Sequence, residues 1–470
     1  MSVLPSVLLS LALGLWGIRR GGAMWRDEAV TYDVTHRGLA DIWHTLGTVD
    51  AVHGFYYVCV HGLYAIFHDV DPLLVLRLPS VLAMCAAAVG VTLIGGRLAG
   101  PRAGLFSGVV FALLPEVQRF AQEGRSYAMV CALVVWATWL LVRAAQTRRP
   151  RLWAGYGGLV LAACLLHEFA VLALLAHAVA VPRAERRRWA VAAAVVVIVV
   201  APLAALSRAQ ATQVSWIEVG GSAFTGAARV WLIGAACTVL LLLKGRTGVR
   251  PATGLPRVAL PLLVVPAAAL MLLSLFKPLY VERYVLYCTA GLALLLGGAL
   301  DRVARGGRPR IALAAVAAAT TLLSLIPTAT QLRSPQSRSD NVTAVAREMR
   351  SLGRPGDGVL YLPGWRRITS LLPGLTVPDG FDDLAADRSP AASHTLYGTE
   401  VPASVLRARM LGHTRVLAVG DPTGAPADPA DVAAVKRTVL GEHFAPCESR
   451  RVHGARLTLY AHPGHCPPTP

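Results

Sequence analysis

Three short clusters of charged and aromatic residues hold the side chains of this sequence that could do chemistry. They are Trp25-Arg26-Asp27-Glu28, the run QEGRSY from Gln122 to Tyr127, and Glu282-Arg283-Tyr284. A carboxylate can take a proton from a hydroxyl group, and a guanidinium group can bind two phosphate oxygens at once. Plainer uses stay open, because acidic residues also favour the start of a helix and an interfacial arginine can pair with a neighbouring glutamate.

Long apolar segments dominate the first 330 residues and must position these clusters. Hydrophobic residues make up 55% of the chain and charged residues only 15%, whereas soluble proteins have about 25% charged residues. A helix needs about 20 apolar residues to cross the membrane. We therefore predict a polytopic α-helical membrane protein with eleven transmembrane helices, and we exclude a disordered chain and an ordinary soluble enzyme. The candidate runs are 2–18, 74–97, 102–117, 126–143, 152–166, 169–182, 189–207, 227–243, 258–276, 283–300 and 309–328.

The distribution of basic residues predicts the orientation of these helices. Five linkers together hold 18 basic residues, whereas the alternate linkers hold only Arg119, Arg125, Arg208 and Lys277. Positively charged loops stay in the cytoplasm, so the N-terminus is expected inside and residues 331–470 outside. The net charge of +18 then reflects membrane topology and not nucleic-acid binding. The arginine-rich composition is typical of a GC-rich bacterium, which places the chain in a bacterial plasma membrane.

Residues 53–67 are apolar but short, and they contain two histidines, so we expect a juxtamembrane helix in the first outer loop and not a twelfth crossing. With this topology, only Glu185 and Asp301 among the carboxylates of residues 1–330 face the cytoplasm. Acidic groups near a bilayer are costly unless they have a function. The outer face is therefore the predicted location of the chemistry.

The order of these motifs resembles the GT-C superfamily of membrane glycosyltransferases, and within it the protein O-mannosyltransferase and aminoarabinose transferase group. The resemblance covers about residues 1–330. It rests on Asp27-Glu28 after the first helix, on the R-L-P-S stretch from Arg77 to Ser80 and on the Q-E-x-R-x-Y stretch from Gln122 to Tyr127. All three occur in the expected order and on the same predicted face of the membrane.

This resemblance implies an inverting transferase that moves a mannose-like sugar or a pentose from a polyprenyl-phosphate donor. The implied acceptor is an extracytoplasmic hydroxyl of a glycan, a lipid or a protein. Such a reaction needs a base for the hydroxyl and cations for the departing phosphate. Asp27 is the implied base, Glu28 would orient either the acceptor or Asp27, and Glu123 is the third implied catalytic residue.

On the donor side, Arg283 is the candidate ligand of the lipid phosphate, because its guanidinium group matches phosphate oxygens. The other predicted substrate-binding residues are Arg125, Tyr127, Lys277, Tyr284 and His167. His167 precedes Glu168, and His53 could approach from the first outer loop. Histidine with a carboxylate suits a divalent metal ion, so the sequence identifies no certain cofactor and leaves a metal ion open.

Two other classes of function stay open as alternatives. A transporter or lipid flippase would place ionisable groups near the middle of the bilayer, whereas here they gather on one face. A non-catalytic membrane scaffold with a degenerate transferase fold would show the same motifs but no transfer. Incubation with labelled polyprenyl-phosphate sugars separates these classes.

Residues 331–470 differ in composition and are predicted to form a small extracytoplasmic α/β domain after the membrane domain of residues 1–330. Helix-like segments at 341–352, 403–411 and 429–440 alternate with strand-like segments at 358–362, 415–420 and 456–461. Acceptor recognition, partner docking and packing on the outer loops all remain open for this domain. Its two cysteines, Cys447 and Cys466, are predicted to form a disulfide, because the outer location permits one.

Overall fold

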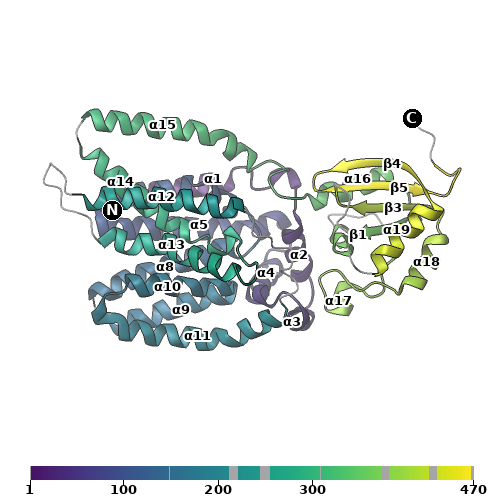
Figure 1. Ribbon diagram of the computed structural model, residues 1–470, viewed down its shortest axis with the longest axis horizontal. Helices are drawn as coiled ribbons and strands as arrows, with labels where there is room; N and C mark the ends of the chain where they lie inside the picture. Colours follow the sequence, from purple (N-terminus) through teal and green to yellow (C-terminus); the bar gives the residue numbers. More distant parts are fainter. Residues whose placement is uncertain are drawn as a thin grey trace. The chain divides into compact units, whose positions relative to one another are not determined.

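The computed structural model describes residues 2–147, 149–210, 221–243, 254–306, 308–371, 380–422 and 431–466. The chain forms two compact units (Figure 1). The first, here called the helical unit, comprises Met1–Ile18, Asp50–Tyr56 and Val70–Leu332. The second, the sheet unit, comprises Arg19–Val49, Tyr57–Asp69 and Arg333–Pro470. Two segments of the first outer loop thus group with the C-terminal part, and a domain division at residue 330 stays a prediction.

A helix lies in each of the ranges that the apolar runs indicate. The helices of the helical unit are α1 (Leu4–Leu15), α5 (Pro72–Ala99), α6 (Pro101–Leu113), α7 (Pro115–Ala121), α8 (Tyr127–Thr147), α9 (Pro150–Leu166), α10 (Ala173–Ala180), α11 (Arg186–Ala209), α12 (Gly221–Leu242), α13 (Gly254–Ser274), α14 (Cys288–Ala304) and α15 (Arg308–Gln331). Short 3-10 turns precede three of them: η3 (Glu168–Leu172), η4 (Arg183–Glu185) and η6 (Glu282–Val285). Helices α5 and α6 approach closely, because a Cβ at Gly104 would lie 2.4 Å from the carbonyl oxygen of Thr92.

Five helices in the described part of the chain are long and apolar enough to cross a membrane: α5, α8, Arg183–Ala209, Phe224–Leu242 and α13. Shorter apolar helices occupy Pro101–Leu113, Pro150–Leu166 and Glu168–Ala180. The chain is therefore a multi-pass helical membrane protein, and the number of eleven crossings stays a prediction. Helix α4 (Gly54–Ile66) has 13 residues and extends about 20 Å, which is less than the roughly 30 Å of hydrocarbon; α1 and α6 are similarly short.

The C-terminal part of the sheet unit contains a five-stranded sheet with the order β2-β1-β3-β5-β4. Its strands are β1 (Gly358–Leu362), β2 (Asp382–Asp383), β3 (Arg415–Gly420), β4 (Ala445–Val452) and β5 (Ala455–Ala461). Strand β1 is parallel to β2 and β3, whereas β5 is antiparallel to β3 and pairs with β4 as a hairpin. The predicted strands are present, and β2 and β4 are additional.

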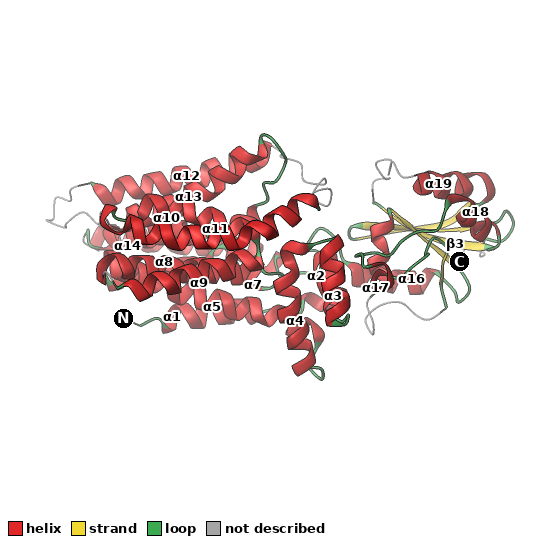
Figure 2. Cartoon of the chain, turned by 90° about the horizontal axis from the view of Figure 1, so that it is seen from below, coloured by secondary structure: helices red, strands yellow, loops and turns green. Residues whose placement is uncertain are grey.

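Helices cover both faces of this sheet (Figure 2). On one face, α18 (Ala403–Leu411) and α19 (Asp431–His443) pack on Leu360 and Val416. On the other face, α16 (Val342–Leu352) packs on Val359 and Leu417. The side chains of successive strand residues point to opposite faces, which places neighbouring residues in different cores. Residues 429 and 430 of the predicted third helix lie outside the described ranges.

The disulfide between Cys447 and Cys466 is present, with the two Cα atoms 5.4 Å apart, and this prediction is confirmed. The predicted first outer loop contributes η1 (Arg20–Gly22), α2 (Arg26–Thr35), α3 (Leu39–Thr48) and most of α4 to the sheet unit. Helix α2 begins directly with the charged cluster that contains Asp27 and Glu28. The first turn of α2 therefore determines where these carboxylates lie.

Candidate active site

In the helical unit, two of the sequence motifs hold each other through backbone atoms. The buried Oγ of Ser80 donates a hydrogen bond to the carbonyl oxygen of Glu123 at 2.6 Å. The side-chain amide nitrogen (Nε2) of Gln122 donates to the carbonyl oxygens of Gly14 at 2.9 Å and Trp16 at 2.6 Å. Arg77 is fully buried and donates to the carbonyl oxygen of Ile18 at 2.7 Å. The R-L-P-S and Q-E-x-R-x-Y stretches thus form one framework around the end of α1.

Next to this framework, aromatic and histidine side chains surround Arg283. We call this group the arginine–aromatic cluster; its members are His53, Tyr127, His167, Phe169, Arg283 and Tyr284. The Cζ of Arg283 lies 5.6 Å from the ring centre of Tyr127 and 5.8 Å from that of Tyr284. The ring of His167 lies 4.5 Å from Tyr284 and 5.6 Å from Tyr127, centre to centre. Cations over aromatic faces are held in place by the negative potential of the rings.

Different elements supply the members of this cluster. Tyr127 is the first residue of α8, and Arg283 with Tyr284 comes from η6. His167 and Phe169 lie where α9 ends and η3 begins. The predicted approach of His53 is confirmed, because its ring centre lies 5.6 Å from that of His167. The structure therefore brings together four segments that are far apart in the sequence.

The two histidines of this cluster are uncharged at neutral pH. Burial lowers the pKa of His53 well below its usual value, and repulsion from Arg125 and Arg283 lowers it further. The pKa of His167 is lowered by burial, by His53 and by the same two arginines. Within the described ranges, the Nδ1 of His167 is buried without a hydrogen-bond partner. Guanidinium groups together with neutral imidazole rings supply hydrogen-bond donors and positive charge, a combination that suits an anionic group.

The remaining predicted site residues of the helical unit differ in their exposure to solvent. Glu123 and Arg125 are both buried, at 2% and 6% exposure, so neither is a surface residue. Lys277 follows α13 and is exposed. Substrate binding by Lys277 stays a prediction.

In the sheet unit, the two neighbouring acids of the first cluster have different environments. The carboxylate of Glu28 lies 2.6 Å from a guanidinium nitrogen of Arg20, and both side chains are buried. The Asp27 side chain is 16% exposed, with its Oδ1 3.9 Å from the Nε of Arg26. Of the two carboxylates, Asp27 is therefore partly exposed, whereas Glu28 is buried in an ion pair with Arg20. The sequence did not indicate Arg20 as its partner.

A metal centre is not evident in the part of the chain that the structure describes. An oxygen of Asp50 lies 3.9 Å from the Nε2 of His53. Nevertheless, the described residues contain no group of three or more histidines, cysteines or acidic residues that could hold a metal ion.

Comparison with known proteins connects this geometry to a family. Residues 56–207 match the family model described as dolichyl-phosphate-mannose-protein mannosyltransferase. The predicted resemblance to GT-C glycosyltransferases is confirmed. No curated protein matches the sequence of the whole chain.

Solved structures with low sequence identity share the fold. ArnT from Cupriavidus metallidurans in the apo state is 13% identical with a TM-score of 0.62, and the match covers 97% of both chains. ArnT bound to undecaprenyl phosphate is 14% identical with a TM-score of 0.53 and covers 99% of both chains. The apo oligosaccharyltransferase of Archaeoglobus fulgidus is 13% identical with a TM-score of 0.51, and the match covers 89% of this chain and 69% of that chain. The fold shared with ArnT thus extends over nearly the whole chain, including its C-terminal part.

Proposed function

We propose that the chain is a glycosyltransferase that moves a sugar from a polyprenyl-phosphate donor to a hydroxyl group of an extracytoplasmic acceptor. The observation that carries this proposal is the arginine–aromatic cluster, in which Arg283 and neutral hydrogen-bond donors lie together. Arg125 is close enough to lower the pKa of both histidines of the cluster, so it adds a second guanidinium group. The fold shared with ArnT, a structure of which contains undecaprenyl phosphate, supports a lipid phosphate as that anion. The family match supports a mannose-like sugar, and a pentose is the other candidate.

On the donor side, we assign the lipid phosphate to Arg283 and Arg125. The phosphate is the leaving group, so negative charge builds up on its oxygens as the bond to the sugar breaks. Guanidinium groups that are already in place stabilise this charge without reorganisation. The hydroxyl groups of Tyr127 and Tyr284 and the neutral ring of His167 would donate hydrogen bonds to the same oxygens. Glu123, which is buried two residues before Arg125, would orient the cationic side of the site.

On the acceptor side, we assign Asp27 as the general base. The acceptor oxygen forms a bond to the anomeric carbon while the bond from that carbon to the phosphate oxygen breaks. The proton of the acceptor hydroxyl passes to Asp27, and the bonding electron pair leaves with the phosphate. Direct displacement inverts the anomeric configuration. The acceptor can be a glycan, a lipid or a protein hydroxyl, and the buried Glu28 acts by holding the loop of Asp27.

The proposal is tested with purified protein, a panel of radiolabelled polyprenyl-phosphate sugars and membrane extracts as acceptors. Asp27→Asn is expected to lower transfer about 10²–10⁴-fold while binding of undecaprenyl phosphate persists. The matched control is Asp69→Asn, because Asp69 lies in the same outer loop with its side chain 90% exposed. Wild-type transfer by the Asp27 variant, or no transfer from any donor by the wild type, would contradict the proposal.

A further inference from the structure

The first turn of α2 has a capping group that comes from a distant part of the chain. The first N–H groups of a helix have no partner within the helix, and they need an acceptor from elsewhere. The side chain of Trp25, at the N-cap position, supplies no such hydrogen bond. The backbone nitrogen of Arg26 donates instead to the Oδ1 of Asp340 at 2.8 Å, across 314 positions of sequence. Asp340 therefore caps the helix whose next residue is Asp27.

Two further hydrogen bonds fasten the chain before α2 to the same segment. The backbone nitrogen of Val342 donates to the carbonyl oxygen of Met24 at 2.8 Å. The Oγ1 of Thr343 donates to the carbonyl oxygen of Gly22 at 2.9 Å. The segment from Gly22 to Arg26 thus runs along residues 340–343. These contacts involve backbone atoms, so they determine the path of the chain and not only the position of one side chain.

The β4–β5 hairpin holds Asp340 in place. Gly454, in its turn, has a φ of +80°, and a Cβ at this position would lie 2.5 Å from the Cβ of Asp340. The backbone nitrogen of Asn341 donates to the carbonyl oxygen of His453 at 3.2 Å. Only glycine allows both this backbone conformation and this approach without strain. Glycine at the hairpin turn therefore allows the backbone of residue 454 to lie close to Asp340.

The side chain of Arg26 contacts Trp365, whose neighbour Arg366 is hydrogen-bonded to the same hairpin. The guanidinium groups of Arg26 and Arg366 each lie 4.5 Å from the ring centre of Trp365. Arg366 also donates to the carbonyl oxygen of Gly454 at 2.8 Å and forms an ion pair with Asp421. Trp365 and Arg366 belong to the 3-10 turn η7 (Gly364–Ser370). Arg26 thus forms a backbone hydrogen bond with Asp340 and a cation–π contact with Trp365.

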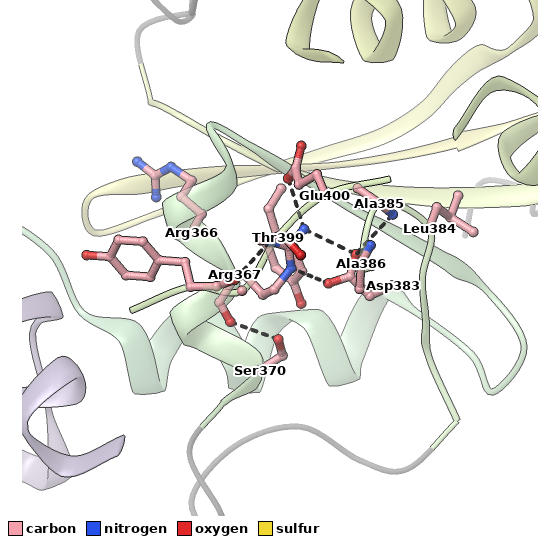
Figure 3. A network of polar contacts seen from close by, with 12 residues as sticks. Arg366, Arg367, Ser370, Asp383, Leu384, Ala385, Ala386, Thr399 and Glu400 are labelled. Atoms are coloured by element: carbon pink, nitrogen blue, oxygen red, sulfur yellow. Dashed lines mark hydrogen bonds and ion pairs between the residues drawn. The ribbon is translucent and has the colours of Figure 1, made fainter. Parts of the chain in front are cut away.

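Ion pairs between the buried Arg367 and two partly exposed carboxylates hold η7 in place (Figure 3). The guanidinium group of Arg367 lies 2.5 Å from an oxygen of Asp383 and 2.9 Å from an oxygen of Glu400. Lys436, 1% exposed, lies 2.8 Å from the same oxygen of Glu400. Figure 3 shows Arg366 pointing away from this network. Arg367 therefore anchors η7 inside the domain, which leaves Arg366 and Trp365 to hold Arg26.

Electrostatics also connects Asp340 to the catalytic carboxylate. Burial raises the pKa of Asp340, the hydrogen bond and charge of Arg26 lower it, and repulsion from Asp27 raises it again. The two carboxylates are therefore within electrostatic reach of each other. A capping residue that also senses the charge of Asp27 is well placed to influence it.

We propose that the C-terminal α/β domain positions the catalytic base: Asp340, Trp365 and the Gly454 turn form a clamp that holds the first turn of α2. This inference rests on the proposed role of Asp27. Asp340 is a positioning residue in it and does not touch the substrate. A displacement of about 1 Å in a catalytic group can cost about 10²-fold in rate, so loss of the clamp slows transfer strongly.

Three variants test the clamp through steady-state kinetics of the full chain. Asp340→Ala removes the acceptor for the Arg26 nitrogen and is expected to lower kcat about 10–100-fold, with the KM for donor within about twofold of wild type. Asp340→Asn keeps an acceptor oxygen and is expected to restore most of this kcat. Gly454→Ala pushes against Asp340 and is expected to lower kcat in the same way. Asp387→Ala, at a side chain 51% exposed in the same domain, is the control and should keep wild-type kinetics.

A second measurement separates the clamp from the proposed function. Hydrogen exchange at the first turn of α2 should be at least tenfold faster in Asp340→Ala than in the wild type or in Asp340→Asn, whether or not the protein transfers sugar. Unchanged exchange and unchanged kcat in both Asp340→Ala and Gly454→Ala would overturn the clamp. An equal loss of donor binding in these variants would overturn it as well, because it would indicate general unfolding. Faster exchange with no dependence of transfer on Asp27 would instead remove the proposed base.

Discussion

Breaking the buried ion pair of Arg20 and Glu28 is expected to destabilise the loop that carries Asp27. A guanidinium nitrogen lies 2.6 Å from a carboxylate oxygen, and the two side chains are 2% and 0% exposed. Arg20 also has a φ of 46°, in the left-handed region that residues with a Cβ rarely adopt. An interaction that holds the chain in this conformation must outweigh its cost, and the ion pair is the interaction in place to do so.

The size of the effect follows from the burial. At an effective dielectric constant of about 20, two unit charges 2.6 Å apart attract each other by about 6 kcal/mol before the cost of removing them from water. Removing one partner leaves the other buried and unpaired, which typically costs about 3–5 kcal/mol. Arg20→Met and Glu28→Gln are therefore each expected to lower local stability by this amount. The double variant with Arg20→Met and Glu28→Gln should lose only about 1–3 kcal/mol, less than the sum of the two single losses, because no unpaired charge is left.

Hydrogen exchange of the α2 and α3 amides in detergent-solubilised protein measures this local stability. A loss of about 3–5 kcal/mol corresponds to exchange about 10²–10⁴-fold faster in each single variant. Arg19→Met is the control, because Arg19 is adjacent and exposed, and it should change stability by less than about 0.5 kcal/mol. Sugar transfer is measured on the same samples.

Two results would refute this reasoning. If the double variant loses the sum of the two single losses, the side chains are not coupled and the pair does not hold the loop. If Glu28→Gln keeps the exchange rates of the wild type but loses transfer, Glu28 acts on the acceptor directly. The two interpretations of Glu28 that the sequence leaves open are thereby separated.

Further expectations concern the donor site, pH, the disulfide and topology. Arg283→Ala should weaken binding of undecaprenyl phosphate and lower turnover at least tenfold, since the phosphate contact exists before the transition state, and the same titration of Lys277→Ala measures whether Lys277 binds the donor. Burial lowers the pKa of His53 and His167, so the unfolded chain binds more protons than the folded chain below about pH 6.5. The contribution of these histidines to stability is therefore full above that pH and is lost as the pH falls. His167→Gln should reduce the fall in Tm between pH 7.5 and 5.5, and a fall identical to that of the wild type would contradict this. Reducing the bond between Cys447 and Cys466, 19 positions apart, should cost the sheet unit up to about 3 kcal/mol in denaturant unfolding, and unprotected thiols in unreduced protein would contradict it. A phosphatase fused after the last residue should be active, and an inactive fusion with an active one in the loop at Gly306 would reverse the predicted orientation.

The helical unit could be predicted from sequence because its signal is local and repeated. Each crossing requires its own run of apolar residues, so α5, α8 and α13 are visible without any tertiary information. The grouping of the first outer loop with the C-terminal domain had no such signal. It depends on hydrogen bonds such as that from Val342 to Met24, in which backbone atoms more than 300 positions apart meet. Backbone hydrogen bonds of this kind can form with any residue type except proline as donor, so the sequence does not reveal them.

Strand β4 shows why part of the sheet was missed. It contains Glu448, Arg450 and Arg451 and is largely exposed along its length, so it lacks the alternation of apolar residues that reveals a strand. It lies at the edge of the sheet, beside β5 only. Charged residues are favoured on edge strands because they discourage pairing with other chains. Strand β5, whose residues alternate between buried and half-buried, was predicted from that alternation.

For the candidate site, residue type predicted which side chains matter but not how each is used. Asp27 and Glu28 are adjacent and chemically alike, yet successive residues of a helix point about 100° apart, so one is partly exposed and the other is buried against Arg20. The direction of a side chain decides its surroundings, and the spacing of residues does not reveal it.

The order of the motifs has a physical cause at the end of α1. The last carbonyl groups of a helix have no partner within the helix, and in an apolar surrounding each needs a donor. Gln122 donates to the carbonyl oxygens of Gly14 and Trp16, and Arg77 to that of Ile18. At Gly124, a Cβ would lie 2.3 Å from the Cγ of Leu76, so glycine lets the two motifs approach. Polar residues with little catalytic character thus end α1 at the point from which the chain continues to Asp27. Glu123, Arg125 and Tyr127, which we propose for the donor site, belong to the same stretch as Gln122. The motifs therefore occur together because one short segment both ends the first helix and carries the proposed binding residues.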